Sequence, residues 1–388
     1  MPPSPQSRLN WLRLTAAEGV GPHTIRRLLQ HFGNVDAIVA AADSGVSIDW
    51  PADMPNSACE AFRAAIARSA PGDERERLSR IDGVLLPFDD DAFPPQMMHI
   101  PDPPALLRVA GQCSVLSAPS IAIVGTRRCS SVGLRQAGRF AAACADAGVV
   151  VVSGGARGID AEAHRAALRA GGATVVVMGS GLGCPYPPEH AGLFDQVRQG
   201  GGALISEYAM NRPPRPSQFP RRNRLISGLA QGVLVVEAPA RSGAMLTARL
   251  AVEAHGRDCW AVPGDADRRE ARGGLEAIRD GWAACVIDPA DVLADLMARL
   301  PAAATEESAS KQALQCSLGE TEGKVLYALR RGGCGVAELV ESIDAIAGEI
   351  LRAVTTLEMS GVLRRSGSRV SLTPAGLEVA AAARRGAC

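Results

Sequence analysis

The chain has 388 residues, of which 47% are hydrophobic and 21% charged, values typical of a globular protein with a sizeable core. It carries 41 basic and 41 acidic residues and has no formal net charge, so any cationic cluster is a local feature. No stretch approaches the roughly 18 apolar residues of a membrane helix, and the first residues, "MPPSPQSRLNWLRL", hold no apolar core of signal-peptide length.

The ten cysteines are scattered along the chain, with no C-x-x-C pair and no Cys/His spacing of a zinc site. Most of them are therefore expected to be reduced, buried thiols. Together with the lack of targeting segments, this predicts a cytoplasmic protein with no membrane association and no metal site.

A small helical domain is predicted over residues 1–75. Within it, "AAEGVGPHTIRRLLQHFG" places small residues at a turn, followed by Ile25, Leu28 and Phe32 at helical spacing. The G-V-G turn resembles that of a helix-hairpin-helix, whose exposed amides can hold a nucleic-acid phosphate, but it also suits a structural turn between packed helices. The stretch 69–77, "SAPGDERER", is predicted to be a solvated connector.

Residues 80–300 alternate between strand-like and helix-like segments. Apolar runs predict strands at 120–125, 149–155, 174–179, 203–207, 232–238 and 258–264. Because these runs are rich in valine and isoleucine, the strands are expected to be buried on both faces of a parallel sheet with helices on both sides. The predicted fold class is α/β, a Rossmann-like, doubly wound, mostly parallel sheet. Two short strand candidates within 81–111 extend it.

Residues 301–316 have the composition of a linker, and residues 317–388 predict a C-terminal winged-helix domain. Three helix-like segments precede "GVLRRSGSRVSLTP", which is typical of a two-stranded wing. The third helix carries two glutamates against one arginine, a poor pattern for a helix among DNA phosphates, so a protein-contact or regulatory role is favoured. The arginines of the wing leave nonspecific contact with duplex DNA open.

The loops that follow the strands have priority as ligand sites, because ligands of doubly wound sheets bind outside the carboxyl ends of the strands. Arginine occurs in four of five such loops, which are "GTRRCSSVG" (125–133), "SGGARGID" (153–160), "GSGLGCPYP" (179–187), 207–224 and "APARSGAMLTA" (238–248). No glycine loop matches the dinucleotide pattern G-x-G-x-x-G followed by a helix. We therefore expect no cofactor.

The glycine loop at 153–160 has two interpretations. It can hold a phosphate, or it can be a tight turn in which Arg157 and Asp160 pair with each other. Asp160 and His164 lie one helical turn apart, and stabilisation of the helix's first turn is favoured over a catalytic pair. The chain also lacks H-E-x-x-H and G-x-S-x-G motifs, so no enzyme is expected.

The densest cationic cluster lies between residues 211 and 224, which hold five arginines, four prolines and no acid. Prolines are expected to keep this segment extended around Phe219, which predicts binding of single-stranded nucleic acid along the arginines with a base on the ring. In the alternative, Phe219 belongs to the core, and Arg224 begins a helix and pairs with Glu207 or Glu237. Too few acids lie nearby to neutralise every arginine, which favours phosphate binding for the group.

Seven motifs occur in the order and spacing of the DNA-processing protein A (DprA/Smf) family: "IAIVGTRR", "VVSGGARGIDAEAHRAAL", "GSGLGCPYPPEH", "LISEY", "FPRRNRLISGLAQGVLVVEA", "SGAMLTARLA" and "AVPG". The chain resembles this family over almost the whole Rossmann-like domain. Its flanks resemble more loosely the family's sterile-alpha-motif-like N-terminal domain and C-terminal winged helix. The resemblance implies a non-catalytic homodimer that binds incoming single-stranded DNA during natural transformation, protects it and loads the RecA recombinase onto it.

The resemblance also implies which residues form the DNA groove. They are Gly125, Thr126, Arg127, Ser153, Gly154, Gly155, Arg157, Gly158, Phe219, Arg221, Arg222, Asn223 and Arg224. A rival interpretation is a nucleotide phosphoribohydrolase-like enzyme on a similar fold, whose P-G-G-x-G-T-x-x-E motif supplies a carboxylate at the glycosidic bond. Here Leu250 stands three residues after Thr247, where that glutamate belongs, which argues against cleavage.

Overall fold

The computed structural model forms two compact units, Met1–Met297 and Ala298–Cys388. It describes residues 4–17, 20–44, 50–51, 56–69, 72–297, 320–329, 334–343, 345–359, 362–366 and 369–373. The predicted linker at 301–316 therefore lies outside the described residues, as do residues 18–19 of the predicted helix-hairpin-helix turn.

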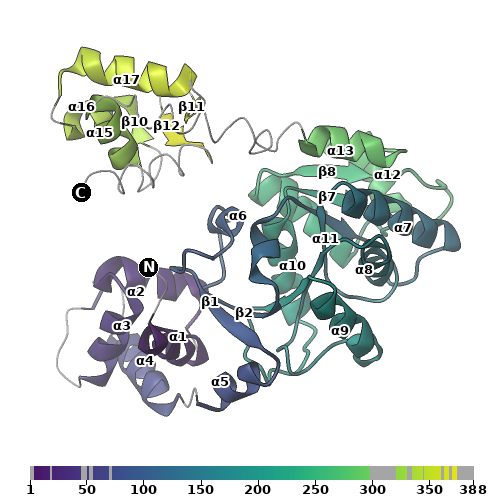
Figure 1. Cartoon of the computed structure of the whole chain (residues 1–388), viewed down its shortest axis with the longest axis horizontal. Helices are drawn as coiled ribbons and strands as arrows, with labels where there is room; N and C mark the ends of the chain where they lie inside the picture. Colours follow the sequence, from purple (N-terminus) through teal and green to yellow (C-terminus); the bar gives the residue numbers. More distant parts are fainter. Residues whose placement is uncertain are drawn as a thin grey trace. The chain divides into compact units, whose positions relative to one another are not determined.

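A nine-stranded sheet with the strand order β1-β2-β6-β5-β4-β3-β7-β8-β9 forms the centre of the first unit (Figure 1). The strands from β6 to β9 in that order run parallel, whereas β1 and β2 are antiparallel to their neighbours at one edge. The strand bounds are β1 (Gly83–Pro87), β2 (Leu106–Gly111), β3 (Ser120–Val124), β4 (Val150–Ser153), β5 (Thr174–Val177), β6 (Ala203–Ser206), β7 (Gly232–Val235), β8 (Asp258–Ala261) and β9 (Ala284–Cys285). All eight predicted strands are confirmed, and the two-residue β9 was not predicted.

The sheet is buried on both faces, as the apolar runs predicted. In β3, Ile121 and Ile123 belong to the core on the side of helices α7 (Ser131–Asp146) and α8 (Ile159–Arg169), while Ala122 and Val124 belong to the core on the side of α10 (Gln218–Leu229). This alternation follows from the two-residue period of a strand. The doubly wound, mostly parallel α/β fold is thus confirmed.

The helices of the Rossmann-like part are α6 (Pro95–Met98), α7 (Ser131–Asp146), α8 (Ile159–Arg169), α9 (Ala191–Gln199), α10 (Gln218–Leu229), α11 (Gly243–Arg249), α12 (Arg272–Arg279) and α13 (Pro289–Met297). Short turns of other helix types lie at η1 (Cys113–Ser117), η2 (Pro188–His190) and η3 (Leu250–Ala254).

The strand order creates a switch point beside β3. The chain places β4, β5 and β6 successively on one side of β3 and then returns to place β7 on its other side. The loops after β3 and β7 therefore lead away from each other, which opens a crevice at the carboxyl ends of these two strands.

The N-terminal segment forms helices α1 (Pro5–Ala16), α2 (Pro22–Phe32), α3 (Val35–Asp43), α4 (Asn56–Arg68) and α5 (Gly72–Ser79). These helices share a core with the edge of the sheet, where Trp11 and Ile38 lie in one buried cluster with Leu106 and Leu204.

The stretch 69–77 is helical from residue 72 onward, as part of α5, and is therefore not an irregular connector, although Asp73, Arg75, Glu76 and Arg77 are exposed as predicted. Glu74 of this helix accepts a 2.7 Å hydrogen bond from Nε of Arg108, a guanidinium on β2 that is only 1% exposed. The backbone N–H of Met210 donates to the same carboxylate at 3.1 Å. The charged stretch is therefore part of a helix. One of its acids, Glu74, neutralises the buried guanidinium of Arg108.

The second unit has the element order α15 (Glu320–Leu329), β10 (Cys334–Gly335), α16 (Val336–Ser342), α17 (Ala347–Met359), β11 (Leu363–Ser366) and β12 (Arg369–Leu372). The predicted two-stranded wing corresponds to the antiparallel pair β11 and β12, which β10 extends to three strands. The winged-helix assignment itself stays a prediction.

Two further expectations concern membranes and thiols. None of the helices among the described residues has the length and apolar character needed to cross a membrane. The eight cysteines in the described part of the chain form no disulfide, but only Cys59, Cys144 and Cys259 are buried, so burial of most thiols was a wrong prediction.

Candidate nucleic-acid interface

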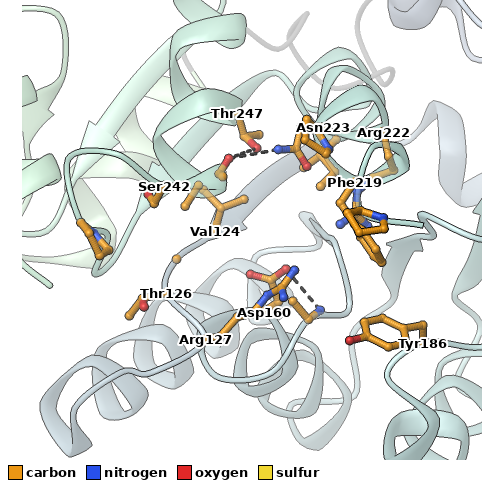
Figure 2. A pocket seen from close by; sticks show the side chains of 18 of the residues that line it. Val124, Thr126, Arg127, Asp160, Tyr186, Phe219, Arg222, Asn223, Ser242 and Thr247 are labelled. Atoms are coloured by element: carbon orange, nitrogen blue, oxygen red, sulfur yellow. Dashed lines mark hydrogen bonds between the residues drawn. The ribbon is translucent and has the colours of Figure 1, made fainter. Parts of the chain in front are cut away.

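A cavity of about 680 Å³ opens at the switch point (Figure 2). It is lined by the loops after β3, β4, β5, β6 and β7 together with the first turns of α10 and α11. Figure 2 shows Phe219 and Tyr186 on one side of the cavity and Thr126 and Ser242 on the other. The lining includes six of the predicted groove residues, namely Gly125, Thr126, Arg127, Phe219, Arg222 and Asn223.

The loop after β3 is held in place by the end of β7. Ser130 donates to Glu237 through both its backbone N–H at 2.8 Å and its hydroxyl at 2.6 Å, and the N–H of Thr126 donates to the Glu237 carbonyl. At Gly125, an added Cβ would lie 2.5 Å from the Ile159 side chain and 2.8 Å from the Glu237 carbonyl oxygen. Only glycine therefore fits where the loop leaves the strand, and this fixes the direction of the arginines that follow.

The extended cationic strip predicted at 211–224 is wrong, because residues from Gln218 onward form the helix α10. Pro220 does not prevent this, since the first N–H groups of a helix have no partner within the helix. The three arginines of "FPRRNR" consequently point in different directions, as helical periodicity requires. Their exposure separates them: Arg222 and Arg224 are buried and Arg221 is exposed.

Arg224 is bound to carboxylates and does not face the cavity. Its Nη2 lies 2.7 Å from Glu207 Oε2, and its Nε lies 3.0 Å from Asp102 Oδ2. These partners raise the pKa of Arg224 against the opposing effect of burial, which is the largest single influence. The alternative for Arg224 is confirmed in its pairing with Glu207, but Arg224 lies in the middle of α10 and not at its start, and its second partner, Asp102, was not predicted.

Arg222 forms part of the cavity wall. Its Nη1 donates to the carbonyl oxygens of Gly154, at 2.8 Å, and Val177, and the residue is only 4% exposed. Burial lowers the pKa of Arg222 to about 10, while the nearby Asp160 opposes this change. Burial also raises the pKa of Asp160, whose Oδ2 accepts from the Gly154 and Ala156 amides at 3.2 and 3.4 Å. Arg222 therefore ties α10 to the ends of β4 and β5.

Three other arginines give the cavity its accessible charge. Arg127 and Arg128 follow β3, Arg215 precedes α10, and all three are exposed and line the cavity. Among the described residues they make no ion pair, in contrast to Arg224. We call Arg127, Arg128 and Arg215 the rim arginines.

Phe219 lies between the protein interior and the cavity. Its ring is half-buried and packs against Gly179, where an added Cβ would lie 2.8 Å from the ring, and it also lines the cavity. The ring centroid of Tyr186 lies 5.4 Å away, and the guanidinium carbon of Arg127 lies 5.8 Å from the Phe219 centroid. The cavity thus presents two aromatic rings beside an exposed cation.

The glycine loop after β4 contributes less than predicted. Gly154 and Arg157 line a small recess next to the main cavity, together with Arg127, Tyr186 and Phe219. Ser153, Gly155 and Gly158 line neither space; Ser153 is fully buried and its hydroxyl donates to the Ile123 carbonyl at 2.6 Å.

The predicted pairing of Arg157 with Asp160 is wrong. Arg157 Nε donates to Glu189 Oε1 at 2.6 Å, and Asp160 bonds to backbone amides instead. His164 is not paired with Asp160 either: its Nδ1 lies 2.7 Å from the Thr174 hydroxyl, and burial lowers its pKa to about 3. Neither residue forms a catalytic pair with the other.

Of the remaining polar lining residues, Asn223 was predicted for the groove, whereas Ser242 and Thr247 were not. Asn223 Nδ2 donates to the Gly243 carbonyl at 3.0 Å and so joins α10 to α11, beside Ser242 and Thr247. Tyr186 lies in the motif "GSGLGCPYPPEH" and Arg215 in the cationic segment 211–224, but neither was among the groove residues that the resemblance implied. Glu253 pairs with Arg249 and lies outside the cavity lining.

Comparisons with known proteins agree with the motif order. Residues 84–297 match the family model of DNA recombination-mediator protein A, and residues 5–42 match that of a DprA-like N-terminal HHH domain. Protein Smf of Synechocystis is 35% identical over 290 residues, covering 74% of this chain and 72% of that protein. Protein Smf of Escherichia coli is 42% identical over 55% of this chain, and the match spans 56% of its length.

Solved structures of DNA processing protein A are also similar to this chain. DNA processing protein A from Streptococcus pneumoniae has a TM-score of 0.64 and 31% identity, covering 76% of this chain and 98% of that one. DNA processing protein A from Helicobacter pylori, in a structure describing its single-stranded DNA binding mode, has a TM-score of 0.51 and 28% identity over 56% of this chain and 97% of that one. The chain belongs to the DNA recombination-mediator protein A family.

Proposed function

We propose that this protein binds single-stranded DNA at the switch-point cavity. The observation that carries the proposal is the pairing, within one cavity, of exposed arginines without carboxylate partners among the described residues and two aromatic rings. Guanidinium groups bind backbone phosphates, and a flat ring can stack with a base of any sequence.

Single strand is favoured over duplex because of where the rings lie. Phe219 is only half exposed within the cavity, and Tyr186 is equally half-buried. A base paired inside a duplex cannot reach such a ring without being unstacked, whereas a base of a single strand is already available. The Helicobacter pylori relative, whose structure concerns single-stranded DNA binding, supports the same choice of ligand.

The wider role follows from the family resemblance. We propose that the chain acts in the cytoplasm as a homodimeric recombination mediator that protects incoming single strands in natural transformation and loads RecA onto them. The role is proposed as non-catalytic, and Asp160, the carboxylate in the cavity, already accepts hydrogen bonds from two backbone amides.

The test is a titration of labelled single-stranded and duplex DNA of the same length and sequence at several salt concentrations. We expect tighter binding of the single strand at moderate salt and a linear fall of log K with log salt, since bound phosphates release counterions. Equal affinity for the two forms at moderate salt would overturn the proposal.

A further inference from the structure

The ion pair between Arg157 and Glu189 lies beside the proposed DNA site. Arg157 belongs to the loop after β4, and Glu189 lies in η2, the turn that follows Tyr186. Two nitrogens of the guanidinium, Nε at 2.6 Å and Nη2 at 2.5 Å, approach the same oxygen of the carboxylate. Hydrogen bonds with Glu189 and, second, Tyr186 raise the pKa of Arg157, while a backbone hydrogen bond and then the bond with Arg157 lower the pKa of Glu189.

The position of Arg157 makes its charge relevant to DNA. It lines the recess that continues the main cavity, next to Arg127 and the two rings of Tyr186 and Phe219. The guanidinium of Arg157 therefore borders the space in which we propose that a single strand binds. In the free protein, however, the guanidinium of Arg157 forms an ion pair with the carboxylate of Glu189.

The pair is easily exchanged. The side chains are 47% and 51% exposed, so water screens their attraction, and ion pairs with such exposure contribute little to stability. Arg224 differs in this respect, because it and Glu207 are both 9% exposed. A phosphate offers the guanidinium two oxygens, whereas Glu189 uses one carboxylate oxygen, so a phosphate can replace it.

We propose that Glu189 is a competitor for Arg157: it occupies this guanidinium in the free protein and gives it up to a backbone phosphate when a single strand binds. The inference rests on the proposed single-strand site and adds a residue that limits its affinity. The recess then carries no net charge from this pair before binding, which lowers attraction for isolated anions.

The experiment compares Glu189→Gln with the unaltered full-length chain in single-strand titrations across salt. Removing the competing charge should tighten binding by about two- to fivefold, the range expected for an exposed ion pair. The slope of log K against log salt should stay nearly unchanged, because the proposal places the contact between Arg157 and a phosphate in the complexes of both chains. Arg157→Ala should weaken binding, and in a chain carrying this change Glu189→Gln should produce a smaller gain.

The matched control is Glu253→Gln. Glu253 also forms an exposed pair with an arginine, Arg249, and lies outside the cavity lining, so it changes the net charge equally without touching the site. We expect Glu253→Gln to change the affinity for single-stranded DNA by less than about twofold relative to the unaltered chain. The slope of log K against log salt should stay unchanged. Urea unfolding of each variant separates effects on binding from effects on folding.

Unchanged or weaker binding by a folded Glu189→Gln chain would overturn the inference and show that the pair only joins the loop after β4 to η2. An equal gain from Glu253→Gln would overturn it as well, because the effect would then be one of net charge. If the unaltered chain fails to prefer single strand over duplex, the proposed function itself fails. That result is distinguishable, because it appears before any variant is compared.

Discussion

Two groups of arginines near the cavity carry the same charge but have different environments. Arg222 and Arg224, which we call the inner pair, lie on α10 and are 4% and 7% exposed. The rim arginines Arg127, Arg128 and Arg215 lie on loops and are exposed. The inner pair is only a few residues from Arg215 in the sequence, yet its members bind carbonyls and carboxylates of the protein. The number of arginines in a stretch of sequence therefore differs from the number of arginines that a ligand can contact.

The difference follows from the cost of burying charge. A guanidinium removed from water is stable only with excellent partners, and once those partners are engaged, little of its charge remains for a ligand. The inner pair therefore stabilises the fold of the cavity wall, while the rim arginines are free to exchange water for phosphate.

Arg224→Ala should have the largest effect and should act on folding. It leaves the carboxylate of Glu207, which is 9% exposed, without its cation, and loss of one partner of a buried pair costs about 3–5 kcal/mol. Urea unfolding followed by circular dichroism checks this, with Arg215→Ala as the exposed control that should change the free energy of unfolding by less than about 0.5 kcal/mol. Similar changes in the free energy of unfolding for the two variants would show that the inner pair and the rim arginines do not differ in their contribution to stability.

Arg222→Ala should have the next largest effect, and it should also lower the free energy of unfolding. Two buried carbonyl oxygens lose their donor, and Asp160 loses a nearby cation, for an expected loss of about 2–4 kcal/mol. The same unfolding measurement applies. Single-strand binding by the fraction that remains folded should keep the salt slope of the unaltered chain, and a clear fall in slope would place Arg222 with the rim arginines.

Phe219→Ala should weaken single-strand binding by about 1–3 kcal/mol through loss of base stacking, with the salt slope nearly unchanged. Phe219→Leu is the matched variant, because it keeps an apolar side chain against Gly179 but removes the flat ring. Fluorescence anisotropy at several salt concentrations measures both quantities. If the Phe219→Leu variant binds single-stranded DNA as tightly as the unaltered chain, the ring contributes only to packing.

The sequence predicted the sheet well because the physical signal is local. Runs of valine and isoleucine such as those around Val151 and Val233 are buried on both faces, and the sheet then determines which loops meet at the switch point. The rim arginines lie in two loops named in advance for this reason.

What the sequence could not reveal depends on distant partners and on helix boundaries. Asp102, which binds Arg224, lies 122 residues earlier in the chain, so no local pattern announces the pair. Four prolines suggested an extended strip, but Pro220 falls in the first turn of α10, where proline is tolerated. Likewise, no local pattern around Glu74 indicates its buried partner Arg108, which lies 34 residues later on β2.

The most direct test of the account is the salt slope of single-strand binding in a chain carrying both Arg127→Ala and Arg215→Ala, compared with Arg221→Ala. Arg221 is an exposed arginine of α10 outside the cavity lining, so it controls for the loss of surface charge. The account predicts that the rim double variant lowers the slope by about 1.4, or about 0.7 for each lost phosphate contact, and that Arg221→Ala leaves the slope unchanged. A slope that falls with Arg221→Ala and stays constant in the rim double variant would contradict it.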